Sequence, residues 1–283
     1  MGKFDGYLIC TDCDGTLTDS YRRFSKENAD AIRYFQQEGG LFTVSSGRYP
    51  HYIQEFAADF VPNTYVVGCN GAVLFDLKKD EVIHHMPIRA SLDEMLIDIY
   101  ENMPWVKSVI LSYKTDQFLH YIAKRDAEAQ WLENTDSLDE GIVVVSSAEE
   151  ISALLKTAVD DIVRILYVHE TEEDNLKTRE ILNKKYSDKF RFVMSWDKGL
   201  EVLDVDCGKG EMIRYMKGIL EGIHTTIGAG DYENDISMLE LCDIGYAVDN
   251  APDFIKAHAD RVTVSCDESA IARIIHDIEV ENS

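Results

Sequence analysis

The sequence predicts an α/β protein with a doubly wound parallel sheet, of the Rossmann-like kind, and an inserted α+β domain. Strand and helix patterns alternate along residues 1–85 and again along 195–283, which is the order of a parallel sheet covered by helices. Between them, residues 86–194 alternate charged helices with apolar strands whose ends carry no acidic pair. We therefore expect a core in two parts, 1–85 and 195–283, and an inserted domain over 86–194.

The bulk composition narrows the class of protein. A chain of 283 residues with 45% hydrophobic content can bury enough core for two domains. Its formal charge of −24, from 28 basic and 52 acidic residues, repels phosphate backbones, so no nucleic-acid partner is expected. Six scattered cysteines favour buried thiols in a reducing compartment. No apolar signal region follows Met1 and no apolar stretch approaches ~20 residues, so we expect a cytoplasmic protein without a membrane partner, either a monomer or a homo-oligomer.

Acidic residues directly follow the first expected strand, at the start of a turn. The apolar segment Tyr7–Thr11 is short enough for a strand buried on both faces, and Asp12, Asp14 and Gly15 follow it. Burial of two anions without a countercharge is costly, so a bound cation is the natural resolution. We interpret Asp12 and Asp14 as a metal-assisted catalytic pair.

Two other interpretations of this stretch fail. A calcium-binding EF-hand loop would need glycine at Leu17 and glutamate at Arg23. Cys10 and Cys13 form a C-x-x-C pair, but residues three apart on an extended strand point to opposite faces, and no second pair exists to complete a zinc site.

The next elements complete the start of a parallel sheet. Ser25 can cap a helix that runs to about Glu38 and ends at Gly39-Gly40. Leu41–Ser45 and Thr64–Cys69 are the expected second and third strands, with an aromatic-rich helix between them. The buried stripe of the first helix is expected to comprise Ala29, Ile32, Tyr34 and Phe35.

Polar residues follow both of these strands. Ser46-Gly47-Arg48 can present a hydroxyl, a backbone N–H and a guanidinium to a phosphate, or it can be an ordinary capped turn. Asn70-Gly71 is a strong turn signal. A hairpin is expected beyond it, formed by Val73–Phe75 and Glu81–Ile83, and no metal site is expected at His84-His85 because adjacent strand residues point in opposite directions.

The inserted segment has its own alternating pattern and no recognisable chemistry. The expected helices are Ser91–Asn102, Ala127–Asn134, Ala148–Thr157 and Glu172–Tyr186. The expected strands are Val109–Tyr113, Gly141–Val145, Ile162–Val168 and Arg191–Met194.

The second part of the core adds a lysine. Leu200–Val205 is an apolar strand pattern with which we expect the core to resume. Lys209 lies between Gly208 and Gly210, before an expected helix Glu211–Leu220, where it can approach a phosphate; a lone lysine is more often a solvated surface residue.

A glycine-rich segment then carries further acids. Thr225–Ile227 is a short strand, and Asp231 and Asp235 follow it before an expected helix Ile236–Leu241. A dinucleotide-binding fingerprint would need glycine at Glu233. With a spacing of four residues, Asp231 and Asp235 can face one side of the first helical turn.

These motifs together resemble a known family. The run from Asp12 to Leu17 matches the D-x-D-G-T-[LV] signature of haloacid dehalogenase-like hydrolases, and three further motifs resemble those of the Cof-type phosphatases within that superfamily. The resemblance spans both ends of the chain and implies that the insertion is the cap that selects the substrate. One departure is Asp249, where many relatives have glycine.

The resemblance implies a role for each matching residue. Ser46 and Lys209 would hold the transferring phosphoryl group, Asp231 would bind magnesium directly, Asn234 would bind phosphate, and Asp235 would support the metal shell. Residues that would bind or line the substrate are Gly47, Arg48, Asn70 and Asn250.

We therefore expect a magnesium-dependent phosphatase that forms a phospho-aspartyl intermediate on Asp12. Asp14 would protonate the leaving alcohol and later deprotonate water. The metal ligands would be Asp12, Asp14 through its backbone carbonyl, and Asp231, with Asp235 in support; this oxygen-donor set suits Mg²⁺. The expected substrate is a small phosphorylated metabolite, with sugar phosphates favoured. A phosphomutase or phosphotransferase, or a non-catalytic phosphate-binding regulator, is the alternative on the same scaffold.

Overall fold

The computed structural model describes residues 2–56, 62–114, 118–123, 142–145, 147–157 and 161–281. The chain forms two compact units. We name them the core unit, Met1–His84 with Cys207–Ser283, and the inserted unit, His85–Asp206. Among the described residues, no helix is long and apolar enough to cross a membrane.

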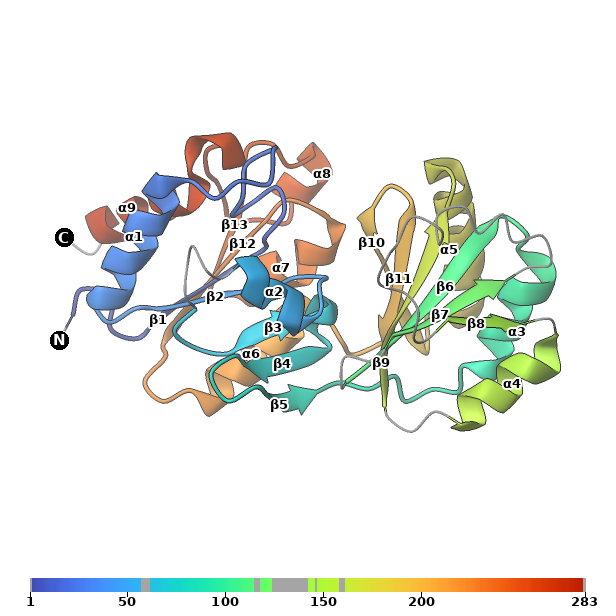
Figure 1. Ribbon diagram of the computed structural model, residues 1–283. Coiled ribbons are helices and arrows are strands. Elements are labelled where there is room, and N and C mark those ends of the chain that lie inside the picture. Colours follow the sequence, from blue (N-terminus) through green and yellow to red (C-terminus); the bar gives the residue numbers. More distant parts are fainter. Residues whose placement is uncertain are drawn as a thin grey trace. The chain divides into compact units, whose positions relative to one another are not determined.

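The core unit is built on a five-stranded parallel sheet with the order β14-β13-β12-β1-β2 (Figure 1). The strand Tyr7–Thr11, β1, which lies between β12 and β2, is buried on both faces, because Leu8, Ile9 and Cys10 have no exposed surface. The expected parallel α/β core is thus confirmed. The strands of this sheet are β1 (Tyr7–Thr11), β2 (Leu41–Val44), β12 (Thr225–Gly230), β13 (Ile244–Ala247) and β14 (Arg261–Val262).

The core unit also contains helices and short 3₁₀ turns. The helices are α1 (Lys26–Gln37), α2 (Pro50–Phe56), α6 (Lys209–Ile219), α7 (Ile236–Leu241), α8 (Asp253–Lys256) and α9 (Ala270–Glu281). The 3₁₀ turns are η1 (Cys69–Gly71), η3 (Glu233–Asp235) and η4 (Cys266–Glu268).

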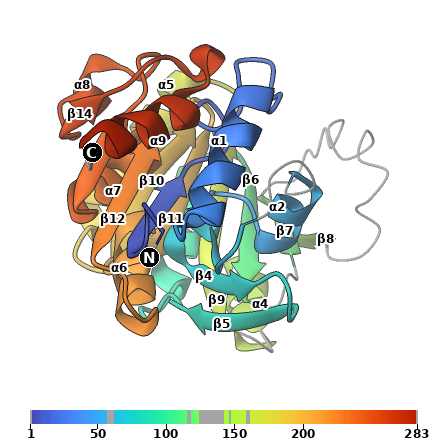
Figure 2. The ribbon, with the colours of Figure 1, turned by 90° about the vertical axis from the view of Figure 1, so that its left-hand side faces the viewer.

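Helix α1 begins where the sequence predicts, since the Ser25 hydroxyl accepts a hydrogen bond from the backbone N–H of Asn28. Its buried face differs from the expected stripe: Ile32 and Phe35 are buried, but Ala29 and Tyr34 are only partly covered. Asn28 is buried instead, because its amide joins three segments. It donates to Leu17 O (3.1 Å) and accepts from the N–H of Ala272 in α9 (2.9 Å), and α1 and α9 lie side by side (Figure 2).

The expected third strand is shorter than the pattern indicated and has a different partner. Strand β3 (Val66–Gly68) pairs with β4 (Val73–Asp76) in antiparallel orientation, and β5 (Glu81–His85) completes this three-stranded sheet. A parallel bridge between Ser45 and Val67 joins β3 to the end of β2. The residues that follow β3 enter the turn η1, which ends the strand early.

The inserted unit contains a six-stranded mixed sheet with the order β10-β11-β9-β6-β7-β8. Its helices are α3 (Asp93–Asn102), α4 (Ala148–Thr157) and α5 (Glu172–Tyr186). Its strands are β6 (Val106–Tyr113), β7 (Phe118–Ala123), β8 (Ile142–Val145), β9 (Ile162–His169), β10 (Phe190–Trp196) and β11 (Gly199–Asp204). The helix expected over 127–134 lies outside the described residues, as does Gly141.

One boundary differs from the expected division of the chain. The core was expected to resume at residue 195 with a strand over 200–205, but β11 pairs with both β10 and β9 and so belongs to the inserted unit. The core unit resumes at Cys207. The apolar pattern of 200–205 marks a strand, observed as β11 over Gly199–Asp204, but it carries no information about which sheet the strand joins.

Candidate active site

The ends of three neighbouring parallel strands gather the expected site residues. Asp12 directly follows β1, Asp231 directly follows β12, and Ser46 lies two residues beyond β2. Strands β1 and β12 end together because Thr11 pairs with Ala229. The carboxyl ends of parallel strands are where α/β proteins build their sites.

Lys209 lies at the centre of this group. It is the first residue of α6 and has no exposed surface, and its Nζ donates to an oxygen of Asp12 and an oxygen of Asp235, both at 2.6 Å. Burial lowers the pKa of Lys209, but the two carboxylates outweigh that effect and raise the pKa above its ordinary value. The lysine therefore stays charged, and the interpretation of Lys209 as a solvated surface residue is wrong.

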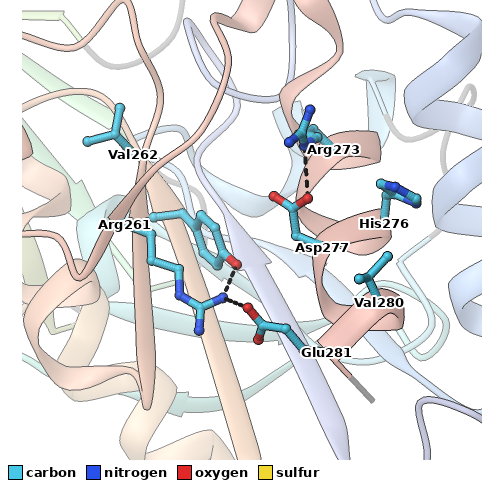
Figure 3. A pocket seen from close by; sticks show the side chains of 8 residues that line it. Arg261, Val262, Arg273, His276, Asp277, Val280 and Glu281 are labelled. Atoms are coloured by element: carbon cyan, nitrogen blue, oxygen red, sulfur yellow. Dashed lines mark hydrogen bonds and ion pairs between the residues drawn. The ribbon is translucent and has the colours of Figure 1, made fainter. Parts of the chain in front are cut away.

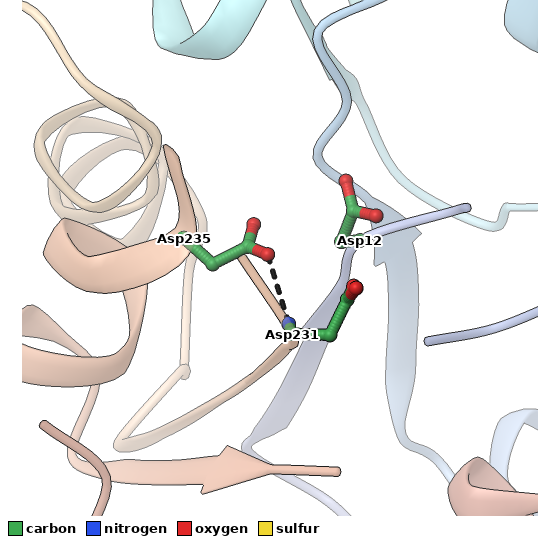
Figure 4. A group of neighbouring side chains, drawn as sticks. All are labelled: Asp12, Asp231 and Asp235. Carbon is green, nitrogen blue, oxygen red and sulfur yellow. Dashed lines mark hydrogen bonds between the residues drawn. The ribbon is translucent and has the colours of Figure 1, made fainter. Parts of the chain in front are cut away.

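Three carboxylates converge on one point (Figure 4). Asp12, Asp231 and Asp235 each offer one oxygen, and these oxygens lie within 4.8 Å of one another. Burial, together with the charge of Asp235, raises the pKa of Asp12 to about 7 against the effect of Lys209. Burial and the charges of Asp12 and Asp235 raise the pKa of Asp231 to about 8. Three anions against one lysine leave a net charge of −2 when all are ionised, which a divalent cation would neutralise.

The donor set of this cluster fits magnesium. The three side chains offer only carboxylate oxygens, the ligands that hard cations such as Mg²⁺ prefer. Both oxygens of Asp235 already accept hydrogen bonds, Oδ1 from Lys209 and Oδ2 from the N–H groups of Asp231 (3.0 Å) and Tyr232 (3.1 Å). Asp12 and Asp231 are therefore better placed to bind a cation directly, with Asp235 orienting the loop around them.

The two acids after β12 meet in a different way from the one expected. They do not share a helical turn, because Asp231 precedes the 3₁₀ turn η3, Asp235 ends it, and α7 begins only at Ile236. The Asp235 carboxylate instead folds back over the start of the turn, where it caps two backbone N–H groups. A spacing of four residues brings the acids together through this cap.

The loop after Asp14 is shaped by its contact with Asp231. Gly15 has a φ of +83°, and a Cβ at this position would lie 2.7 Å from Asp231 Oδ2. The neighbouring Thr16 hydroxyl donates to Asp231 Oδ1 at 2.7 Å. The sequence pattern does not mark Thr16 as a site residue, although Thr16 belongs to the same D-x-D-G-T run as the two acids.

Asp14 stands apart from the buried carboxylates. Its side chain is 41% exposed. The Arg48 guanidinium donates hydrogen bonds to both of its oxygens, from Nε to Oδ2 (3.0 Å) and from Nη2 to Oδ1 (3.1 Å). The guanidinium of Arg22 lies 3.8 Å from Oδ1. The pair Asp12 and Asp14 is thus split between a buried environment and a partly exposed one, which allows two chemical roles.

The remaining polar residues form a second group. The buried Ser46 hydroxyl accepts the backbone N–H of Arg48 (3.1 Å), with Gly47 between them. Asn70 donates its backbone N–H to Ser46 O (3.0 Å), and its side-chain oxygen accepts the amide of Asn234 (3.0 Å). Segments after three different strands therefore meet here.

Asn250 is placed differently from an expected pocket residue. Its side-chain N–H donates to Gly15 O at 2.8 Å, and its oxygen accepts the N–H of Cys266 at 2.8 Å. Both ends of the amide thus hold backbone in place, which favours a role in fixing the Gly15 loop; a substrate contact by Asn250 stays a prediction.

A separate pocket lies between β14 and α9 (Figure 3). Its arginines are paired: Arg261 bonds the Tyr246 hydroxyl and Glu281, and Arg273 bonds Asp277. The pocket contains none of the expected site residues.

Comparisons with known proteins identify similar sequences and a similar structure. A family model described as haloacid dehalogenase-like hydrolase matches residues 9–275. The phosphatase YwpJ of Bacillus subtilis is 26% identical over 95% of this chain and 98% of its own. The 5-amino-6-(5-phospho-D-ribitylamino)uracil phosphatase YitU of the same organism is 24% identical over 95% and 96%. The structure of a haloacid dehalogenase-like hydrolase from B. subtilis superposes with a TM-score of 0.74 at 25% identity, covering 95% of this chain and 98% of that one.

Proposed function

We propose, from the premise that this chain belongs to the haloacid dehalogenase-like hydrolases as a Cof-type phosphatase, that it hydrolyses small phosphorylated metabolites with the help of Mg²⁺. The reaction would pass through a phospho-aspartyl intermediate on Asp12. The observation that carries the proposal is the buried pairing of Asp12 with Lys209 beside Asp231 and Asp235.

Asp12 is the nucleophile in this proposal. Lys209 holds one of its oxygens, which fixes the direction of the carboxylate. Lys209 also brings a positive charge to the position where phosphoryl oxygens gather charge during transfer. A buried, oriented and charge-compensated carboxylate is suited to attack phosphorus.

Asp14 is the general acid and then the general base. Its partial exposure and its pairing with Arg48 leave it outside the buried cluster. A carboxyl group there can reach a leaving alcohol and, after the first step, a water molecule. Proton transfer of this kind typically contributes about 10²–10⁴-fold.

Magnesium would be held by Asp12 and Asp231, with the Asp14 backbone carbonyl as a further proposed ligand and Asp235 in support. When bound, the cation supplies positive charge that polarises the phosphoryl group. The proposed phosphate contacts are Ser46, Gly47, Asn234 and Arg48. All of these residues lie in the core unit.

The substrate class follows from the relatives and from the division of the chain. The name of YitU states that its substrate is a phosphorylated ribityl compound. A phosphorylated polyol or sugar is therefore the proposed substrate class here. The inserted unit is the proposed cap, which would select among such compounds. We further propose a reducing, cytoplasmic setting, because all six cysteines are buried and free.

A panel of phosphorylated metabolites would test the proposal. The purified protein should release inorganic phosphate from a subset of sugar and polyol phosphates in Mg²⁺, and excess chelator should stop the release. Chelator-resistant turnover, or no turnover with any panel member or with an activated aryl phosphate, would contradict it.

A further inference from the structure

The turn η1 has an uncommon backbone. Its three residues all have positive φ: 50° at Cys69, 54° at Asn70 and 100° at Gly71. Left-handed backbone is unfavourable for residues with a Cβ, and two such residues in succession are unusual. Conformations of this kind persist where the surroundings hold them, and they gather at functional sites.

Asn70 links this turn to two other segments of the site. It is 1% exposed, so its polar atoms depend on protein partners. Its backbone N–H donates to Ser46 O (3.0 Å) in the loop after β2, and its side-chain oxygen accepts Nδ2 of Asn234 (3.0 Å) in η3. This second hydrogen bond fixes the rotation of the Asn234 amide plane.

Gly71 brings the turn against a third segment. A Cβ at Gly71 would lie 2.1 Å from Gly208 O and 2.7 Å from the backbone nitrogen of Lys209. The backbone of η1 therefore packs directly against the start of α6. Lys209 is the first residue of this helix, and its side chain extends from there to Asp12.

We propose that η1 is a positioning element for phosphate binding, in which Asn70 orients the amide of Asn234 and the strained backbone sets Ser46, Asn234 and Lys209 at fixed spacing. The inference rests on the proposed function and goes beyond it, because it makes Asn70 a residue that acts through Asn234 without touching the substrate. An amide that is already oriented loses less freedom when it binds a phosphate.

The variant Asn70→Gly isolates the side chain. Glycine keeps the left-handed backbone without strain, whereas alanine would add strain of its own. Asp80→Gly is the matched control: Asp80 also has a positive φ (56°), its side chain is 74% exposed, and it lies in the hairpin turn between β4 and β5. The probe is inorganic phosphate, titrated calorimetrically into the Mg²⁺-loaded full chain, with the thermal midpoint measured alongside.

Asn70→Gly should weaken phosphate binding about tenfold, the change that corresponds to one typical hydrogen bond. Asp80→Gly should leave phosphate binding unchanged. If Asn70 acts through Asn234, the double variant Asn70→Gly/Asn234→Ala should bind no more weakly than Asn234→Ala alone.

Two results would overturn the inference: wild-type phosphate affinity in Asn70→Gly, whether or not its thermal midpoint falls, and losses that multiply in the double variant. Phosphoester hydrolysis is measured separately. Absence of hydrolysis with phosphate binding intact would refute the proposed function alone, whereas absence of phosphate binding by the unaltered protein would refute both.

Discussion

Lys209 lies between Asp12 and Asp235, with its Nζ 2.6 Å from one oxygen of each carboxylate. The lysine and the two acids come from three segments of the core unit and are all buried. The single ammonium group of Lys209 thus compensates the charge of two carboxylates in a low-dielectric environment. Asp12, the proposed nucleophile, and Asp235, which caps the loop around Asp231, therefore share Lys209 as their countercharge.

Replacing Lys209 should damage stability as well as activity. Lys209→Met leaves two buried carboxylates without their partner, and breaking a buried ion pair in this way costs about 3–5 kcal/mol. Urea unfolding with chelator present would measure the loss. Lys217→Met is the control on the same helix, because Lys217 is 30% exposed and pairs with Asp243 at the surface; such a pair is worth about 0–1 kcal/mol. Equal losses in the two variants would show that burial of the Lys209 group has no special weight.

The two acids after β1 should fail in different ways. Asp12→Asn should abolish turnover and phosphoprotein formation, because an amide is a poor nucleophile. Asp14→Asn removes the proton donor, so turnover should fall about 10²–10⁴-fold. With an activated aryl phosphate the leaving group needs no proton, and a phosphorylated enzyme should accumulate. Intact-protein mass spectrometry would detect it, and peptide mapping that placed the phosphoryl group on Asp14 or Ser46 would contradict the assigned roles.

Stability of the metal-free protein should fall as pH rises. The pKa values of Asp12 and Asp231, about 7 and about 8, lie above the ordinary value of 3.8, so the folded state holds more protons than the unfolded state between these limits. The associated stability is fully present below pH 3.8 and is lost as pH passes 7 to 8. Mg²⁺ should therefore stabilise the protein more at pH 8 than at pH 6.

Urea midpoints at several pH values, with Mg²⁺ or with chelator, would check this linkage. Asp231→Asn should flatten the pH dependence in chelator, since it removes one of the two raised carboxyl groups. A gain from Mg²⁺ that is the same at pH 6 and pH 8 would argue against proton release on metal binding.

Gly15→Ala should weaken the metal site through a single methyl group. Its Cβ would approach Asp231 Oδ2 to 2.7 Å. Gly222→Ala is a matched control, because Gly222 also has a positive φ (+78°) but its Cβ would meet nothing within 4 Å. Both variants bear the same kind of backbone strain, so both should lose some stability. Calorimetric titration with Mg²⁺ should show weaker binding only for Gly15→Ala, and equal affinities would mean that Asp231 moves aside freely.

The start and end of the inserted unit are tied by an ion pair that should respond to acid. Asp204 accepts the backbone N–H (3.0 Å) and the guanidinium of Arg89. Burial raises the pKa of Asp204, but the hydrogen bonds from Arg89 outweigh it and hold that pKa below its ordinary value. The stabilisation is present above pH 3.8 and is lost as pH falls through the lowered pKa.

Arg89→Met should lower the free energy of unfolding near neutral pH, because it removes the guanidinium hydrogen bonds that the Asp204 carboxylate accepts. The difference from the wild type should shrink as pH falls below 4. A difference that stays constant down to pH 3, measured by urea unfolding, would point to lost packing of the arginine stem instead.

Local pattern determined the elements and most of the chemical groups. The apolar run Tyr7–Thr11 is β1 as expected, and α4, α5 and α7 have the bounds expected from the sequence. Strand ends then place acids at one edge of a parallel sheet, which singled out Asp12 and Asp14, whereas the functional interpretations of Ser46 and Lys209 depended on the family resemblance. These features depend on neighbours a few residues apart in the chain.

Partners distant in sequence were decided only by the tertiary structure. The apolar pattern of Leu200–Val205 fits a strand in either unit, and only the pairing of β11 with β9 and β10 assigned it to the inserted one. Thr16 meets Asp231 across 215 positions, and Asn250 closes on Gly15 across 235. The two hydrogen bonds from the Arg48 guanidinium to the Asp14 carboxylate likewise join two loops. Hydrogen-bond and ion-pair partners depend on how the strands order themselves in the sheet, because that order sets which loops lie side by side, and it leaves no trace in local periodicity.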